Sequence, residues 1–276
     1  MAKTKSEYRC SECGWSTAKW VGQCSSCQAW GTVSETTSVT KAKPAQISSA
    51  RAARPITDIE TSGEGHYPTG VQEFDRVLGG GLVPGAVVLL SGEPGVGKST
   101  LLLEVAARLA KGGKKVLYVS AEESASQVKL RATRTSALSE NLFLATETDL
   151  SSVLGQIGQV DPELIIVDSV QTVSSLDLDG VAGMPAQVRE VASNLIRVAK
   201  ESSTPLVLVG HVTKDGSIAG PRTLEHLVDV VCHFEGDRQT SLRFIRTLKN
   251  RFGPTDEVGC FEMSGEGILE LPDPSS

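Results

Sequence analysis

The 276-residue sequence contains no long apolar run and few aromatic side chains. Its longest uninterrupted apolar stretches are four or five residues, as at 86–90 and 164–167. A helix needs about 20 apolar residues to cross a bilayer, so we predict no membrane span. Aromatic residues make up 4% of the chain, which argues against a broad surface for stacking nucleic-acid bases.

We also predict no secretory signal. The first 30 residues hold charges and four cysteines, and they contain no apolar segment of the kind a leader peptide has. We therefore expect a cytoplasmic protein. In that compartment thiols stay reduced, and closely spaced cysteines more often bind metal than form disulfides.

The chain as a whole has no excess of basic residues, since its net charge is −6. The charge is unevenly placed, however. Residues 1–55 contain 8 Lys and Arg against 3 Asp and Glu, which gives +5, and the remaining 19 basic and 30 acidic residues give −11 over 56–276. A uniformly basic nucleic-acid coat is therefore excluded, and any polyanion must be bound by local basic groups.

Composition divides the chain into three zones. Residues 1–31 hold four of the six cysteines and all three tryptophans, which predicts a small zinc finger. Residues 32–55 lack hydrophobic periodicity and are typical of a flexible linker. Strand and helix patterns then alternate through residues 56–276, which predicts a single large domain.

Short aliphatic or β-branched runs in this last zone predict strands at 87–91, 115–120, 164–168, 206–210, 230–234 and 242–248. Amphipathic stretches predict helices at 99–111 and 187–200. Near-continuous apolar strands that alternate with such helices indicate an α/β fold with a mainly parallel central sheet, covered on both faces. Ligands of such sheets bind beyond the carboxyl ends of the strands.

Residues 92–99 read Gly-Glu-Pro-Gly-Val-Gly-Lys-Ser and fit the P-loop motif G-x-x-x-x-G-K-[ST] in full, between a predicted strand and a predicted helix. The glycines let backbone N–H groups turn toward phosphates, and the helix N-terminus favours an anion. We predict that Lys98 neutralises the β- and γ-phosphates of ATP and that the Ser99 hydroxyl ligates Mg²⁺. The predicted ATP- or ADP-binding residues are Gly92, Glu93, Pro94, Gly95, Val96, Gly97, Lys98, Ser99, Thr100 and Asp168.

Two acidic positions extend this site. Asp168 ends a buried strand, as a second Mg²⁺ ligand does in P-loop proteins, but the next residue is Ser169 and not an acid. The strand at 115–120 is instead followed by Ala121, Glu122 and Glu123. Side chains alternate on an extended segment, so only one of the two acids can face the γ-phosphate. We choose Glu122 as the acid that orients water; that both are first-turn acids of the next helix stays open.

A guanine-binding [NT]-K-x-D motif is absent, because the run at 213–216 has its acid one place early. ATP is therefore favoured over GTP.

Several motifs resemble a known family. Asp168-Ser169-Val170 after its strand is similar to the RecA-type ATPase core, and the run Lys-Asn-Arg-Phe-Gly at 249–253 is the signature of the bacterial RadA (Sms) family of DNA-repair and recombination ATPases. The segments at 74–82, 120–124 and 220–222 resemble that family as well, so the match covers essentially the whole chain. The family usually continues into a Lon-protease-like domain that this sequence does not contain, and we expect a truncated or short form.

The resemblance implies a DNA-dependent ATPase that forms a hexameric ring like the DnaB helicase. It implies movement on single-stranded DNA and branch migration of recombination intermediates together with the RecA recombinase. An ATP-switched, zinc-bearing scaffold that does not translocate is the alternative. A small-molecule P-loop kinase is a third interpretation, but the sequence shows no acceptor pocket or lid.

Lys249 and Arg251 stand two residues apart at the end of a predicted strand, so both should project to one side. Two cations placed in this way suit the γ-phosphate of a neighbouring subunit, as arginine fingers do. A solvated basic strand end, closed by the Gly253-Pro254 turn, is the alternative.

The family's DNA contacts map onto loops. In RecA-type motors, the loops after the Mg²⁺-binding strand and after the next strand face the central channel, here about 174–185 and 211–222. The second loop offers Lys214 and Arg222 as contacts to DNA phosphates, or as ordinary loop cations. His211 stands where this fold commonly carries a γ-phosphate sensor, or it is simply a satisfied polar residue.

The N-terminal zone predicts a metal site. Two C-x-x-C pairs, with ten residues between the inner cysteines, can complete a tetrahedral zinc shell from Cys10, Cys13, Cys24 and Cys27. So short a segment cannot otherwise bury enough surface to fold, so the metal would provide the folding energy. Iron could replace zinc on expression. A redox role is disfavoured, because no thioredoxin-like pattern surrounds the pairs.

The other residues of interest in this zone are aromatic. We expect Trp15, Trp20 and Trp30 to pack around the metal as a miniature core. Outside the zone, Cys232 and Cys260 are expected to be small buried hydrophobes.

Overall fold

The computed structural model describes residues 7–36, 53–58, 65–212, 223–236 and 240–271. It contains two compact units, Met1–Glu60 and Thr61–Ser276. Among the described residues, no helix combines the length and apolarity that a bilayer span requires.

The smaller unit contains a three-stranded antiparallel sheet in the order β2-β1-β3. The strands are β1 (Glu7–Cys10), β2 (Ser16–Thr17) and β3 (Val33–Thr36), and a short 3₁₀ helix, η2, follows at Ile56–Asp58. β3 pairs with β1 along its whole length and lies beyond residue 31, where the sequence analysis ended the finger. The reason is Val33, which is buried against Cys10 and Cys24.

One expectation for this unit is wrong. Trp15 packs beside the small core of Cys10, Cys24 and Val33, but Trp20 is 65% and Trp30 75% exposed. Tyr8 and Val21 fill the space around the cysteines instead. The core is too small to receive three indoles.

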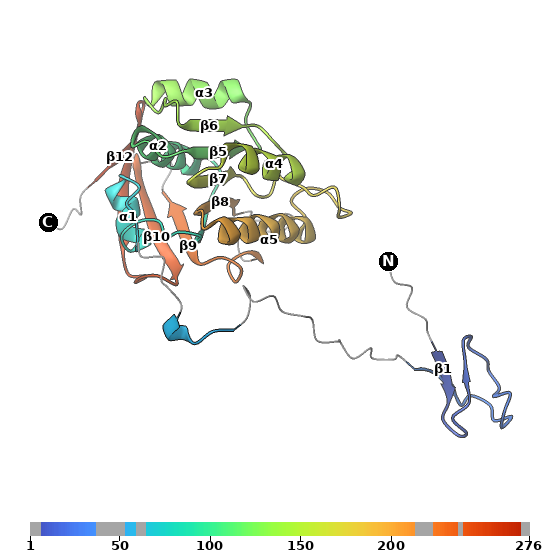
Figure 1. Ribbon diagram of the computed structural model, residues 1–276. Coiled ribbons are helices and arrows are strands. Elements are labelled where there is room, and N and C mark those ends of the chain that lie inside the picture. Colours follow the sequence, from blue (N-terminus) through green and yellow to red (C-terminus); the bar gives the residue numbers. More distant parts are fainter. Residues whose placement is uncertain (1–6, 37–52, 59–64, 213–222, 237–239, 272–276) are drawn as a thin grey trace. The chain divides into compact units, whose positions relative to one another are not determined.

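The larger unit is built on a nine-stranded sheet in the order β12-β11-β10-β9-β4-β8-β7-β5-β6 (Figure 1). The six strands from β9 to β6 in this order are parallel, and β10, β11 and β12 extend the sheet beyond β9, each antiparallel to the strand beside it. The strands are β4 (Val87–Gly92), β5 (Val116–Ser120), β6 (Leu142–Ala145), β7 (Leu164–Asp168), β8 (Leu206–His211), β9 (Val230–Glu235), β10 (Leu242–Asn250), β11 (Val258–Ser264) and β12 (Gly267–Glu270).

Helices cover both faces of this sheet, because the side chains of its buried strands alternate between two apolar layers. One layer contains residues of α1 (Gln72–Leu78), α2 (Lys98–Lys111) and α3 (Ala125–Arg134) together with Val88 and Leu90. The other contains residues of α4 (Leu150–Val160) and α5 (Pro185–Ser202) together with Val87 and Leu89. The predicted α/β fold is confirmed.

The six predicted strands and two predicted helices are present, with ends shifted by no more than two residues. The carboxyl ends of β4, β8, β7 and β5 lie side by side, since these strands are consecutive in the sheet and parallel. These strand ends carry the motifs that were predicted to bind ATP.

Candidate nucleotide site and metal ribbon

The P-loop joins the buried strand β4 to helix α2. Gly95 (φ 78°) and Gly97 (φ 114°) have left-handed backbone conformations that favour glycine. A Cβ at Gly97 would also stand 3.1 Å from the Met263 sulfur. The turn therefore depends on glycine twice, for backbone conformation and for space.

Lys98 points back into this loop. Its Nζ donates to the carbonyl oxygens of Gly92 and Glu93, at 2.9 Å each. The side chain is 3% exposed, and burial lowers the pKa of its ammonium to about 8, although Asp168 and Glu122 act in the opposite direction. A phosphate oxyanion in the loop would stabilise the charged form of this buried cation.

A pocket of about 360 Å³ lies between the P-loop and the ends of β5, β7 and β8. Most of the predicted nucleotide-binding residues line it, namely Pro94, Gly95, Gly97, Lys98, Ser99, Thr100 and Asp168. Glu122, Glu123, Arg131 and His211 complete the wall together with Ser120 and Met263. The structure thus brings together P-loop residues and strand ends that lie far apart in the sequence.

Asp168 and Ser99 face the same pocket. Asp168 is 6% exposed, and its Oδ2 accepts a hydrogen bond of 2.7 Å from the buried Tyr118 hydroxyl. A carboxylate and a hydroxyl are oxygen ligands of the kind that Mg²⁺ prefers, and Mg²⁺ keeps its other positions for water and phosphate. The two side chains therefore fit the predicted ion.

Glu122 and Glu123 have separate partners. Glu122 Oε1 accepts hydrogen bonds from His211 Nε2 at 2.9 Å and from Ser169 Oγ at 2.5 Å. The His211 bond is the main reason why the pKa of Glu122 lies below its ordinary value, against the effect of burial. Glu123 forms an ion pair with Arg131 of α3. Glu122 is thus an ionised carboxylate held beside Asp168 and Lys98.

The interpretation that both acids begin the next helix is wrong. α3 starts at Ala125 behind a capping box made by Ser124 and Gln127, and no acid lies in its first turn. Both glutamates therefore stand in the loop ahead of the cap.

Arg131 lines this pocket, and sequence reasoning missed it. Its side chain is 15% exposed, and it comes from α3, which the sequence analysis did not predict. An arginine on an amphipathic helix carries no motif of its own, so only the tertiary placement of α3 reveals its position.

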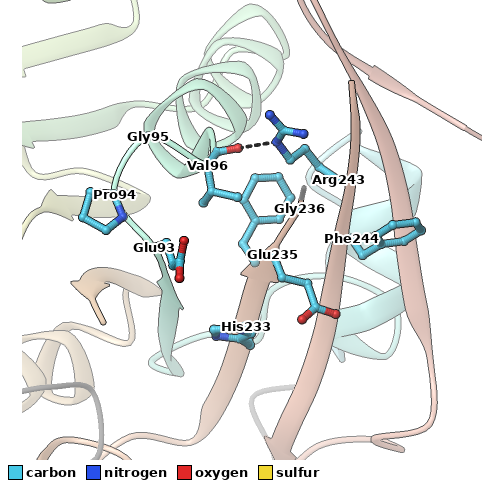
Figure 2. Close-up of a pocket in the computed structure, with 10 residues that line it drawn as sticks. Glu93, Pro94, Gly95, Val96, His233, Glu235, Gly236, Arg243 and Phe244 are labelled. Carbon is cyan, nitrogen blue, oxygen red and sulfur yellow. Dashed lines mark hydrogen bonds between the residues drawn. The ribbon is translucent and has the colours of Figure 1, made fainter. Parts of the chain in front are cut away.

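A second pocket, of about 410 Å³, lies on the other side of the P-loop (Figure 2). Glu93 and Val96 line it together with residues of β9 and β10. Figure 2 shows Arg243 reaching the loop, where its Nε donates to the Val96 carbonyl at 2.9 Å. The two pockets share Pro94 and Gly95, so the loop forms the wall between them.

Lys249 and Arg251 lie at the opposite end of the strands from the P-loop. Lys249 Nζ donates to the carbonyls of Glu225 and Val228, at 2.8 and 2.7 Å. Arg251 Nη1 donates to Asp229 Oδ1 at 2.9 Å, and the other oxygen of Asp229 accepts from the N–H of Val87. Val87 begins β4, whereas the P-loop follows its last residue, so the two ends are about 16 Å apart.

Asp229 was not expected from the sequence. It is 2% exposed, and Lys200 Nζ also reaches it at 2.9 Å. Burial raises its pKa, but hydrogen bonds from Lys200, Val87 and Arg251 outweigh that effect and leave the pKa below its ordinary value. The carboxylate therefore stays charged and holds the half-exposed Arg251 at this edge.

The remaining predicted residues fall into two groups. Lys214 and Arg222 lie outside the described residues. Cys232 is buried, as expected, and Cys260 is partly buried.

In the smaller unit the four predicted cysteine ligands converge. Their sulfur atoms all lie within 4.8 Å of one another, with Cys10 and Cys27 3.7 Å apart and Cys13 and Cys24 3.6 Å apart. A tetrahedral ion with bonds of about 2.3 Å requires sulfur separations of about 3.8 Å. The four sulfur atoms are therefore gathered as a four-coordinate metal ion requires.

Thr32 supports this cluster. Its hydroxyl lies 3.2 Å from Cys10 Sγ, and this hydrogen bond is the main cause that lowers the pKa of the Cys10 thiol to about 6. A thiolate is the form that binds metal.

Together these features define the class of protein: a P-loop ATPase core with a RecA-like α/β sheet, joined to a four-cysteine metal ribbon. A family model described as an AAA domain matches residues 62–217, and one described as a rubredoxin metal binding domain matches residues 8–35. The chain belongs to this AAA-domain family.

Curated relatives specify the resemblance further. The chain is 54% identical to the DNA repair protein RadA of Mycolicibacterium smegmatis and 46% identical to that of Bacillus subtilis. These matches cover 99% and 100% of this chain and 61% of each relative, so the chain spans about three fifths of their length. The resemblance to the RadA family is thereby confirmed.

Solved structures agree on the fold. A KaiC-like protein of Pyrococcus horikoshii matches with a TM-score of 0.61 at 19% identity, over 75% of this chain and 99% of that one. A RadB recombinase matches with a TM-score of 0.56 at 22% identity, over 74% and 99%.

Proposed function

We propose that the chain is a DNA-dependent ATPase of recombinational repair that works as a DnaB-like ring on single-stranded DNA. The observation that carries this proposal is the separation of Lys98 from Lys249 and Arg251. The phosphate pocket stands at one end of β4, and the two cations stand at the other end. They lie too far from the phosphates of their own chain to contact them, which supports a site that a second copy completes.

Within one chain, each pocket residue has a proposed task. Lys98 binds the β- and γ-phosphates, and Ser99 and Asp168 hold Mg²⁺, which when bound neutralises phosphate charge. Glu122 accepts a hydrogen bond from the attacking water and orients it. Lys249 and Arg251 of the neighbouring copy stabilise the charge that develops on the transferred phosphoryl group.

The second pocket suits the rest of the nucleotide. It adjoins the P-loop through Glu93 and Val96, and its wall includes the Arg243 guanidinium and the Glu235 carboxylate. We propose that the nucleoside part of ATP extends into it.

His211 is proposed to couple nucleotide and DNA. It ends β8 and binds Glu122, and the chain continues directly into the segment that carries Lys214 and Arg222. Those two cations are proposed to bind DNA phosphates. His211 would then sense the γ-phosphate through Glu122 and relay its presence to those cations.

The relatives' names support repair as the setting. We further propose that the ring is a hexamer that promotes branch migration of recombination intermediates together with a RecA recombinase. The ribbon's metal ion is proposed to be zinc.

The test measures ATP hydrolysis with and without single-stranded DNA, and displacement of a labelled strand from a forked duplex. We expect stimulation by DNA and ATP-dependent displacement, both lost in Lys98→Ala. Stimulated hydrolysis without displacement would overturn the motor and support an ATP-switched scaffold. Absence of hydrolysis in the wild-type chain would overturn the ATPase itself.

A further inference from the structure

Tyr118 places a buried hydroxyl beside both residues that are proposed to hold Mg²⁺. The side chain is 2% exposed, and its hydroxyl donates to Asp168 Oδ2 at 2.7 Å. Burial, followed by the charge of Asp168, raises the pKa of this hydroxyl well above its ordinary value, whereas Ser99 lies near enough to lower it in part. Tyr118 thus contacts one proposed ligand of the ion and neighbours the other.

The sheet and helix α2 create this arrangement. In the parallel pairing of β5 with β7, Tyr118 stands opposite Ile166, and both belong to the apolar layer on one face of the sheet. Side chains two residues apart on a strand share a face, so Asp168 points to the same side as Ile166. Helix α2 packs on that face and carries Ser99 in its first turn. The Tyr118 hydroxyl therefore lies where the end of β7 meets the start of α2.

Packing by itself does not require this hydroxyl. The Tyr118 ring lines a mainly apolar cavity of about 250 Å³ together with Leu103, Val128 and Leu144. A phenylalanine would fill the same space, and burying a hydroxyl costs free energy unless it forms a hydrogen bond. Among the described residues, Tyr118 is the one side chain that hydrogen-bonds the Asp168 carboxylate. The hydroxyl therefore has its role at that carboxylate.

We propose that Tyr118 is a positioning residue for the Mg²⁺ of the nucleotide site. By holding Oδ2, its hydroxyl fixes the orientation of the Asp168 carboxylate and leaves Oδ1 for the ion. Groups that hydrogen-bond a metal ligand orient it, and their loss typically weakens metal binding or activity by roughly 10- to 100-fold. The proposal rests on the proposed function for the identity of the ion and of its nucleotide.

Binding of ADP to the full chain, with and without Mg²⁺, tests the proposal without relying on hydrolysis. Tyr118→Phe keeps the ring and its packing and removes only the hydroxyl. When no divalent cation is added, a fluorescent ADP analogue should bind this variant as it binds the wild type, because the P-loop is unchanged. Mg²⁺ should tighten binding to both proteins, but the Mg²⁺ concentration for half of that effect should be about 10-fold higher in the variant.

Tyr67→Phe is the matched control. The Tyr67 hydroxyl donates to the carbonyl of Glu163 at 3.1 Å, and Glu163 precedes β7, whereas the nucleotide pocket lies at the other end of that strand. Loss of this hydroxyl should leave the Mg²⁺ requirement unchanged. Thermal unfolding of both variants measures the effect of each hydroxyl on stability separately from its effect on the ion.

A double-mutant cycle with Asp168→Asn shows whether Tyr118 acts through that carboxylate. Effects of residues that work through one another do not add. We therefore expect Tyr118→Phe to raise the Mg²⁺ requirement in the wild-type chain and to change it little in a chain that already carries Asp168→Asn. Additive effects in this cycle would contradict the proposal.

The remaining outcomes separate this proposal from others. A Tyr118→Phe chain with the wild-type Mg²⁺ requirement, whatever its unfolding temperature, would overturn the positioning role and leave the hydroxyl a contributor to stability alone. An equal loss of ADP affinity with and without Mg²⁺ would overturn it too, because the defect would then lie outside the ion site. A raised Mg²⁺ requirement in a chain whose hydrolysis DNA does not stimulate would support Tyr118 while the proposed motor fails.

Discussion

Glu122 Oε1 and His211 Nε2 lie 2.9 Å apart, although another strand lies between the two strands that position them. Glu122 follows β5 and His211 ends β8, and β7 runs between these two strands. Ser169, directly after β7, donates to the same oxygen of Glu122. Three consecutive strand ends thus converge on one carboxylate.

Glu122→Gln should lower the rate of ATP hydrolysis at least about 100-fold, because a neutral amide cannot orient and polarise the attacking water as a carboxylate does. ATP binding, measured by a fluorescent nucleotide, should be retained. Glu123→Gln is the matched control, since it removes one charge at the adjacent residue and breaks only the pair with Arg131. A larger loss in the control than in Glu122→Gln would reverse the assignment.

His211→Ala should change the pH dependence of hydrolysis. The hydrogen bond from His211 lowers the pKa of Glu122, so the carboxylate stays ionised further into acid. Without the bond that pKa rises toward its ordinary value, and the acid limb of the kcat/KM profile should move to higher pH. Ser169→Ala removes a weaker contribution and should move the limb less. Profiles that superimpose would contradict this account.

Subunit mixing should show that the site is shared. Lys98→Ala chains lack a working P-loop, and Arg251→Ala chains lack a cation, so each should hydrolyse ATP poorly alone. In an equal mixture, about one site in four combines an intact P-loop with an intact neighbouring cation, and activity should return to roughly that fraction. Lys200→Ala is the control, because Lys200 binds the same Asp229 but has no proposed part in catalysis. Full activity of Arg251→Ala alone, or no recovery on mixing, would refute donation between chains.

Removal of the metal should unfold the ribbon and leave the ATPase unit intact. A unit of this size buries too little surface to fold without its ion. We expect one ion per chain by elemental analysis, and, when a chelator removes it, a red shift confined to the emission of Trp15, the one indole that packs against the described ribbon core. Cys27→Ser should lose the ion, whereas Ser25→Ala, at an exposed neighbouring position, should keep it. Zinc leaves the protein colourless; visible thiolate absorption would identify iron and correct the predicted metal.

Three of the elements that were missed have weak local signals. β6 has only four residues and is half-exposed, and β12 is as short. α4 contains Gly155 and Gly158, which weaken its helical signal. The strands that the sequence did predict include fully buried apolar runs, whose residue types follow from their surroundings alone.

The amino-acid sequence by itself determined the features that lie within short stretches of the chain: the P-loop, the four cysteines and the alternating α/β pattern. These features are local, because backbone conformation and ligand spacing are set by neighbouring residues. Only the tertiary structure decided which of two adjacent glutamates faces His211, that Arg131 enters the pocket, and that Arg251 is held by Asp229 at the far edge. It also decided that Trp20 and Trp30 stay in water. Each of these features depends on the order of strands in the sheet or on the limited volume of a core. No short stretch of residues determines either the strand order or the core volume.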